Sequence, residues 1–430
     1  MFNKKILLVL ATIGFLFLLD NFVSNKFLKK KQENVPKIKI DRGGYLVSDS
    51  IGYVPNVFSW GFNRHICFDV KYKTWWIFYY KSNKKIPPWL PSESYIVYKY
   101  SKDNGKVWSK EIKLEEGNQA ADFTIDCSPP DISIAYGDVY DVKEYQSKIF
   151  WKKGIMGDNS IKWFVSSTAM QSNPQEHYTR VIPSIVYYKG YPFLSVHDQS
   201  EQGNENGYQR VYVAVAEDSD GKKWKKEVVI LKKHNKKRLD TIPFVSLAQV
   251  KDKLVAIINL EEYKLFISEY LGNNKWSDAK FIKGLNYGGG VPEWSTVTDS
   301  DGLLHILYPE KDTAKTMHAV FDWKNWRFEA VNNGENAHRT IGVSTDDFNN
   351  LYSISKRNLT LNFFSDGKWK KIKDSINDTT IPLDYVTLPQ KVYEGKLGFA
   401  WVDGDERDPN IWFICIEKDP ESFADFKKCQ

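Results

Sequence analysis

The stretch Ser101-Lys-Asp-Asn-Gly-Lys-Val-Trp108 decides the fold of this chain. The Asp103 side chain can accept hydrogen bonds from nearby backbone N–H groups, and Gly105 tolerates a positive φ angle. The stretch therefore predicts a tight turn between two strands. Trp108 follows the turn and is expected to pack between neighbouring strands. Residues 218–224 and 365–369 keep part of the same pattern, and a recurring turn indicates a repeated β unit.

The repeated unit consists of an apolar strand, a turn, a second strand, a loop, a third strand and a turn that closes on Trp. Seven segments fit it, and they begin near Arg64, Asp126, Arg180, Asp240, Glu293, Arg339 and Asp384. Blades of four strands run about 40–50 residues, and extra length goes into loops. The repeat predicts an all-β chain that forms a single β-propeller over residues 40–430, with seven four-stranded blades. Six blades are the alternative, if the Asp126 or the Asp384 segment is an embellishment. The last segment supplies three strands, so a strand within residues 37–47 is expected to complete its blade.

The pattern S-x-D-x-G-x-x-W at residues 101–108 resembles the Asp-box, or BNR repeat, of sialidase-like β-propellers. The resemblance implies that these turns are structural and lie together on one rim. In a blade of this kind the innermost strand starts on the opposite face. A ligand site is therefore expected on that opposite face, at the mouth of the central channel.

Charged residues stand at the expected starts of the innermost strands. Arg64, Arg180 and Arg339 are expected to bind a carboxylate, because a guanidinium group offers two parallel N–H donors. Sialidases are similar in using an arginine triad, an Asp acid/base and a Tyr–Glu nucleophile pair, and residues 179–183 resemble their R-I-P motif with an inserted valine. That resemblance implies these catalytic candidates: Asp126, Asp240, Glu293 and Tyr385. Ordinary salt bridges at strand ends are the alternative reading of the charges.

Histidines accompany the same arginines at positions 65, 177 and 338, and His197 opens a long loop expected on the same face. BNR-type propellers also include polysaccharide lyases, in which His or Tyr removes a proton from a uronate. A general base works best with a pKa near the operating pH, which imidazole supplies, so His177 is a further catalytic candidate. Trp89 is expected to stack on a sugar ring. Three functions follow: hydrolysis of an acidic glycan, β-elimination of a uronate-containing glycan, or glycan or protein binding without chemistry. Whether the chain is an enzyme stays open.

The net charge of +6 is concentrated in the first 40 residues, which hold eight lysines and two acidic residues. The rest of the chain is close to neutral and lacks the basic surface of a nucleic-acid binder. The four cysteines have no C-x-x-C spacing, and Asp403, Asp405 and Asp408 lack the spacing of a calcium loop. We therefore expect no metal, no cofactor and no nucleic acid, but an acidic glycan as partner of a monomeric protein.

The N-terminal sequence has the pattern of a targeting segment. Lys4 and Lys5 precede an unbroken apolar run over residues 6–19, which suits a signal peptide or an uncleaved signal anchor. Residues 1–24 are assigned to this segment and residues 25–39 to a lysine-rich stalk. The body is then expected outside the cytoplasm, in the periplasm, secreted or at the cell surface. There Cys67–Cys127 or Cys415–Cys429 could pair, with buried free thiols as the alternative.

Overall fold

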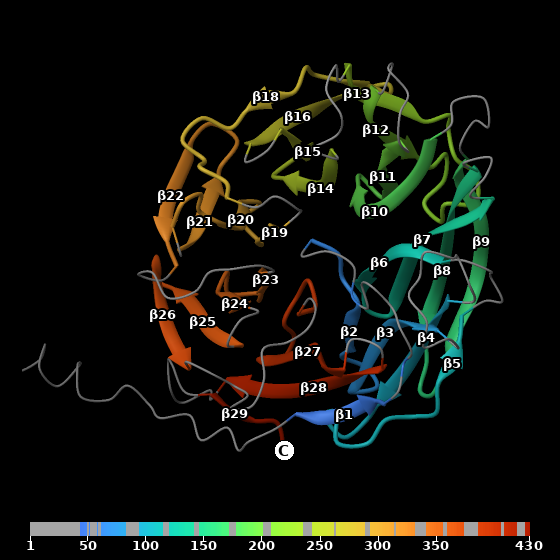
Figure 1. Ribbon diagram of the computed structural model, residues 1–430. Coiled ribbons are helices and arrows are strands. Elements are labelled where there is room, and N and C mark those ends of the chain that lie inside the picture. The colour runs from blue at the N-terminus through green and yellow to red at the C-terminus, as the bar shows by residue number, and fades with distance from the viewer. Residues whose placement is uncertain are drawn as a thin grey trace, which may run out of the picture.

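The computed structural model shows seven β-sheets arranged as blades around a central axis (Figure 1). It describes residues 44–430 apart from 50, 52–57, 59–61, 83–93, 115–119, 142–145, 172–177, 201–207, 235–242, 262–263, 289–292, 314, 332–340, 356–358, 374–385, 406–407 and 419–425. No helix occurs among the described residues, so none of them forms a helix long and apolar enough to cross a membrane. The expected all-β propeller is confirmed, with seven blades rather than six.

Each blade is an antiparallel sheet whose strands follow one another outward from the axis. Blades 1 to 3 each consist of four strands that are consecutive in the sequence. Blade 1 contains β2 (Ile66–Asp69), β3 (Thr74–Ser82), β4 (Ser94–Ser101) and β5 (Ile112–Lys113). Blade 2 contains β6 (Ala120–Ser128), β7 (Asp131–Asp141), β8 (Gln146–Met156) and β9 (Ile161–Gln171). Blade 3 contains β10 (Tyr178–Tyr188), β11 (Tyr191–Ser200), β12 (Tyr208–Val215) and β13 (Val228–His234).

The later blades follow the same plan. Blade 4 contains β14 (Phe244–Val250), β15 (Lys253–Glu261), β16 (Lys264–Gly272), β17 (Lys275–Trp276) and β18 (Lys280–Phe281). Blade 5 contains β19 (Ser295–Thr298), β20 (Leu304–Pro309), β21 (Thr316–Phe321) and β22 (Trp326–Ala330). Blade 6 contains β23 (Ile341–Thr345), β24 (Leu351–Ser355), β25 (Thr360–Ser365) and β26 (Lys368–Lys373).

Blade 7 closes the ring with strands from both ends of the described chain. It contains β27 (Lys396–Asp405), β28 (Asp408–Lys418), β29 (Phe426–Lys428) and β1 (Tyr45–Ser48). Both β1 and β29 pair with β28, and Thr387 bridges to Ala400 on the axial side of β27. A strand from the N-terminal side therefore completes the last blade, as the sequence predicts. Closure of this kind ties the first described strand of the chain to the last blade.

The turn over residues 101–108 has the hydrogen bonds that its sequence predicts. Asp103 Oδ1 accepts from the Ser101 hydroxyl at 2.7 Å and from the Val107 N–H at 2.9 Å. Gly105 has φ of +92°, and a Cβ there would lie 2.2 Å from the Phe413 ring in β28. Trp108 packs edge-on against the same ring. The turn therefore joins blade 1 to blade 7.

The partial copy at residues 218–224 joins blade 3 to blade 2 in the same way. Gly221 has φ of +74°, and a Cβ there would lie 2.4 Å from Trp151 Nε1 in β8. Trp151 Nε1 donates to the Asp220 carbonyl at 2.9 Å, and the Trp224 ring packs edge-on against Trp151. In both cases a turn of one blade covers an aromatic ring in the third strand of the preceding blade.

The propeller has two distinct faces. Innermost strands end at the turns that lead into the second strands, such as those at Lys251 and Gly302. Ser101, at the start of the 101–108 turn, pairs with Trp75 close to the corresponding turn of blade 1. These turns therefore share one face, which we name the turn face. The opposite face, where the innermost strands start, is named the loop face.

Two disulfides reinforce the ring. Cys67 in β2 and Cys127 in β6 join blades 1 and 2, with a Cα–Cα distance of 6.1 Å. Cys415 in β28 and Cys429 near the C-terminus are joined with a Cα–Cα distance of 5.4 Å. Both distances lie in the usual range for a disulfide. The cysteines are therefore paired in disulfides and are not free thiols. The targeting segment and the stalk, residues 1–39, lie outside the described residues.

Candidate functional site

Two side chains from the segment before β2 cross the central axis. Arg64 Nη2 donates to the Thr296 carbonyl of β19 at 2.6 Å. Phe62 stacks on Trp294, with ring centroids 5.3 Å apart. Blades 1 and 5 are not neighbours in a ring of seven, so these contacts span the channel.

Arg64 is a buried cation. The residue is 6% exposed, and no carboxylate of a described residue forms an ion pair with its guanidinium group. Desolvation lowers its pKa to about 10, because burial penalises the charged form. Buried charges in proteins are normally paired. The guanidinium group thus has unused capacity to bind an anion.

A cavity of about 520 Å³ opens on the turn face, around the axis. Six of the seven blades contribute to its wall, including these polar residues: Asp126, Ser128, Tyr187, Gln249, Lys251, Thr298, Asp299, Thr345, Gln390, Lys391 and Tyr393. Thr296, whose carbonyl accepts the Arg64 bond, is also part of the wall. The guanidinium group therefore donates a hydrogen bond to a residue of the cavity wall. We name this space the axial cavity.

Asp126 is the acid of the axial cavity. Its carboxyl group makes no hydrogen bond or ion pair with any described residue. Desolvation raises the pKa of its carboxyl to about 6, and the phenols of Tyr187 and Tyr393 lie near enough to interact with it electrostatically. Burial also raises the pKa of Tyr393 to about 12. A carboxyl group that titrates near neutral pH suits general acid chemistry.

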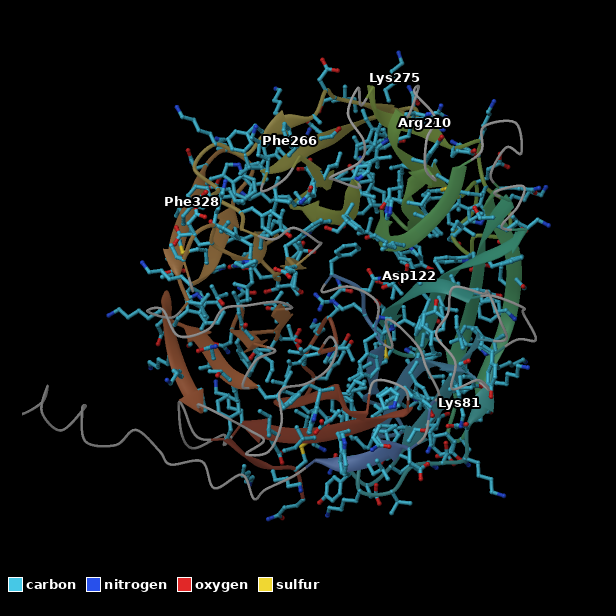
Figure 2. The ribbon with its side chains drawn as sticks, viewed as in Figure 1. Lys81, Asp122, Arg210, Phe266, Lys275 and Phe328 are labelled. Carbon is cyan, nitrogen blue, oxygen red and sulfur yellow. A yellow bond between two sulfur atoms is a disulfide. The ribbon has the colours of Figure 1, made fainter. Side chains whose placement is uncertain are left out.

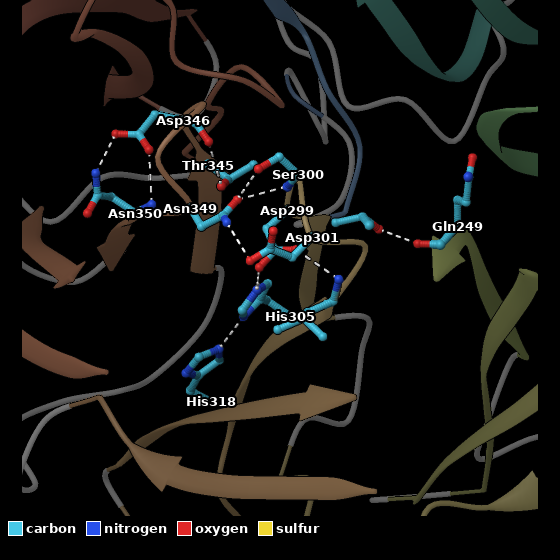
Figure 3. A network of polar contacts seen from close by, with 12 residues as sticks. Gln249, Asp299, Ser300, Asp301, His305, His318, Thr345, Asp346, Asn349 and Asn350 are labelled. Carbon is cyan, nitrogen blue, oxygen red and sulfur yellow. Dashed lines mark hydrogen bonds and ion pairs between the residues drawn. The ribbon is translucent and has the colours of Figure 1, made fainter. Parts of the chain in front are cut away.

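The cavity wall between blades 4, 5 and 6 is a network of hydrogen bonds (Figure 3). Thr298 Oγ1 donates to the Gln249 carbonyl at 2.5 Å, and Asn349 Oδ1 accepts from the Ser300 N–H at 2.9 Å. Asp299 Oδ1 accepts from the Leu303 N–H at 2.8 Å. These bonds fix the turns that form the rim of the cavity.

Asp299 and its partner His305 do not follow from the motifs of the sequence. Asp299 Oδ2 lies 2.9 Å from His305 Nε2, and both side chains are buried. The spacing of the two residues does recur in the sequence. In blade 6, Asp346 and Tyr352 are also six residues apart, and Asp346 Oδ2 accepts from the Tyr352 hydroxyl at 2.8 Å. An aspartate at the end of the innermost strand thus holds a polar side chain of the second strand in both blades.

Three of the candidates named from the sequence are described with their side chains. Arg64 lies before β2, at the position expected. Asp126 lies near the end of β6, where it pairs with Ser133, and not at the strand's start, because β6 already begins at Ala120. It therefore faces the axial cavity on the turn face. Glu293 precedes β19 and is buried, with its N–H donating to the Tyr287 hydroxyl at 3.0 Å. These positions do not test the catalytic roles.

The other candidates have no described side chain. Arg180 belongs to β10, with its backbone paired to Asp198. The remaining candidates lie outside the described residues: Trp89, His177, Asp240, Arg339 and Tyr385. Convergence of the three arginines stays a prediction. Two described histidines, His65 and His197, are buried, and burial lowers the pKa of each to about 3. Both are therefore neutral and weakly basic at neutral pH.

No family model matches the chain, and no curated protein matches it. Solved structures do match. An ulvan lyase of polysaccharide lyase family PL25, bound to -[GlcA(1-4)Rha3S]-, has a TM-score of 0.55 and 11% sequence identity, and the match covers 90% of this chain and 97% of that chain. The same lyase in another structure matches equally. The endosialidase of phage phi92 has a TM-score of 0.50 and 10% identity, over 88% of this chain and 69% of that chain.

At these identities the likeness establishes the fold alone. The chain is a seven-bladed β-propeller, and the similar propellers named above are carbohydrate-active enzymes.

Proposed function

We propose that this protein recognises an acidic carbohydrate in the central channel of its propeller, with Arg64 as the group that binds the ligand's carboxylate. The observation that carries the proposal is a buried guanidinium group that donates to Thr296 in the wall of a polar cavity and has no carboxylate partner among the described residues. A ligand carboxylate would supply the missing counter-charge through charge-assisted hydrogen bonds. Arg180 and Arg339 are proposed to converge on the same ligand from the loop face.

The chemistry proposed for the channel is hydrolysis of a glycosidic bond, with Asp126 as the general acid. Its raised pKa supports this role, since a carboxyl that is partly protonated near neutral pH can protonate a leaving oxygen. Two similar propellers support an acidic ligand. One carries a uronate-containing saccharide and the other is an endosialidase. The Asp-box resemblance of the 101–108 turn agrees with such a scaffold.

We further propose that the propeller is exported and that its N-terminal segment serves as signal or membrane anchor. Two disulfides in the described part of the chain support this location, because disulfides persist in oxidising compartments. Fractionation of cells that express the full-length protein tests it. Recovery in the cytoplasm with four reduced thiols contradicts export.

Binding is tested by calorimetry with the full-length protein and three sets of oligosaccharides: sialylated, uronate-containing and neutral. Arg64→Gln is expected to weaken binding of the carboxylate-bearing ligand about tenfold to about a hundredfold, since a charge-assisted hydrogen bond contributes roughly 1.5–3 kcal/mol. Arg210→Gln is the matched control, because it removes the same charge from β12, away from the axis (Figure 2). Equal loss in both variants, or tight binding of the neutral set by the unaltered protein, contradicts the proposal.

The products separate the chemical alternatives. Free sialic acid or a new reducing end indicates hydrolysis, whereas ultraviolet absorbance from an unsaturated uronate indicates β-elimination. Binding without either product makes the propeller a non-catalytic recognition module. Asp126→Asn should abolish hydrolysis while it leaves binding intact, and unchanged hydrolysis would remove Asp126 from the mechanism.

A further inference from the structure

Four titratable side chains form a continuous chain across blade 5, from its axial turn to its outermost strand. Figure 3 shows the first three of them, Asp299, His305 and His318. Asp299 Oδ2 lies 2.9 Å from His305 Nε2, and His305 Nδ1 lies 2.9 Å from His318 Nε2. His318 Nδ1 lies 2.8 Å from Glu329 Oε1. The first three side chains are buried, whereas the Glu329 side chain is 39% exposed. We name this set the blade 5 chain.

The three contacts of the blade 5 chain need three protons. Each contact joins two atoms that can accept a hydrogen bond, so each must contain one hydrogen. Two neutral imidazoles supply one N–H each. With both carboxyl groups ionised, one contact would therefore oppose two lone pairs. All three contacts are satisfied only when the chain holds one further proton.

Trp369 offers an alternative that needs no further proton. Its Nε1 lies 3.1 Å from His318 Nδ1 and can donate to it. In that state His318 is neutral and accepts from the indole, and Glu329 is ionised without a hydrogen bond to the imidazole. Burial favours neutral His318, whose pKa it lowers to about 4. The chain thus has a state with two protons at higher pH and a state with three protons at lower pH.

With three protons, the blade 5 chain can transfer charge without moving a side chain. In one end state the extra proton is on Glu329, which donates to His318 Nδ1, while His318 Nε2–H donates to His305 Nδ1 and His305 Nε2–H donates to Asp299. If each proton moves to the acceptor of its own contact, Glu329 becomes ionised and Asp299 becomes protonated. Both imidazoles stay neutral and change tautomer, and every contact remains satisfied.

The blade 5 chain extends from the axial cavity to a cleft on the outer side of the blade. Asp299 is part of the wall of the axial cavity. Glu329 lines a cleft of about 410 Å³ between blades 5 and 6, to which Asp299 and His305 also contribute. The other charged groups that face this cleft are Arg327, Asp301 and Asp366. The chain therefore links the exposed cleft to the wall of the axial cavity.

We propose that Asp299, His305, His318 and Glu329 form a proton relay, which exchanges protons between the cleft of blades 5 and 6 and the axial cavity. The four residues act through one another and are positioning residues rather than catalytic ones. The relay rests on the proposed function for its purpose, because an acid such as Asp126 must be reprotonated after each turnover. Its existence does not depend on any glycan, so it is tested without one.

The test is nuclear magnetic resonance of the full-length protein with nitrogen-15 in its histidine rings, over the range of about pH 3.5 to about pH 8, which includes the lowered pKa of His318. The His305 and His318 signals are assigned by their loss in His305→Gln and His318→Gln. Both rings should move their proton from Nε2 to Nδ1 together, in one shared transition, as the state with Asp299 protonated becomes populated. Glu329→Gln should abolish the transition in both rings, because the amide can still donate to His318 Nδ1 but has no proton to transfer.

Trp369→Phe should move the shared transition to higher pH, since the indole no longer competes for His318 Nδ1. Glu269→Gln, at a glutamate that pairs with Lys253 in blade 4, is the matched control and should change neither ring. Independent transitions of the two rings, or a shared transition that survives in Glu329→Gln, overturns the relay. If the protein binds no acidic glycan, or if Arg64→Gln does not weaken binding, the proposed function fails but these spectra are unaffected. The two proposals can therefore fail separately.

Discussion

Replacing Asp126 by asparagine should stabilise the protein at neutral pH. Desolvation raises the pKa of this carboxyl from 3.8 to about 6, and each unit corresponds to about 1.36 kcal/mol. The shift therefore sets an upper bound of about 3 kcal/mol for the cost of keeping Asp126 ionised in the folded state. The side chain is partly exposed to the axial cavity, so we expect a stabilisation of about 1–2 kcal/mol after allowance for solvent screening.

The direction of the pH dependence follows from the raised folded-state pKa. Above about pH 6 the folded and unfolded states both carry the carboxylate, and the folded state bears the full desolvation cost. Between about pH 6 and pH 3.8 the folded state binds the proton more tightly, so the stability of the unaltered protein rises as the pH falls. Below this window both states are protonated and the cost is absent. The advantage of asparagine should therefore be present near pH 7.5 and lost near pH 4.

Urea denaturation of the unaltered protein and of Asp126→Asn at these two pH values measures the difference in unfolding free energy. Asp278→Asn, at an exposed position in blade 4, serves as the control for loss of one carboxylate. An equal effect at both pH values, or destabilisation by Asp126→Asn near pH 7.5, refutes the reasoning. Residues of functional sites are often less favourable for stability than their replacements. A gain in stability in Asp126→Asn would agree with a functional role for Asp126.

The turns and the disulfides give two further predictions. Gly221→Ala should lower the unfolding free energy by about 2 kcal/mol or more, because the residue has φ of +74° and its Cβ would lie 2.4 Å from Trp151. Gly367→Ala, with φ of +70° and open space around it, should cost only about 1 kcal/mol of backbone strain; equal losses in urea titrations contradict the packing argument. Loss of Cys67–Cys127, which closes 60 residues, should cost about 4 kcal/mol, and loss of Cys415–Cys429, which closes 14, about 3 kcal/mol. Paired Cys→Ala variants measure both, and the opposite order contradicts the chain-entropy account.

Most of the fold is predictable from local patterns. The turn at residues 101–108 depends on Asp103 and Gly105, which act within a few bonds of each other. Strand alternation and the recurrence of similar segments then give the blades and their number. Even the closing strand near residue 45 follows, since the last segment lacks one strand. These features are local because hydrogen bonds of a turn and the pleat of a strand join residues that are close in sequence.

The candidate site is much less predictable. Asp126 was expected at the loop face because its segment was aligned on charged residues, and the alignment placed it several residues too early in β6. That difference moves it along the strand toward the turn face. Asp299, His305 and His318 carry no motif, and their role becomes visible only when β19, β20 and β21 lie side by side.

The sequence by itself determined the repeated blade, its structural turns and the position of Arg64 before β2. The tertiary structure alone decided which of these meet. Arg64 reaches the Thr296 carbonyl across 232 residues of chain, and no periodic pattern reports that contact. The physical reason is that ring closure brings together the ends of strands from different blades, so distances across the axis depend on the whole ring. The burial that leaves Arg64 without a described counter-ion and raises the pKa of Asp126 is a consequence of that closure.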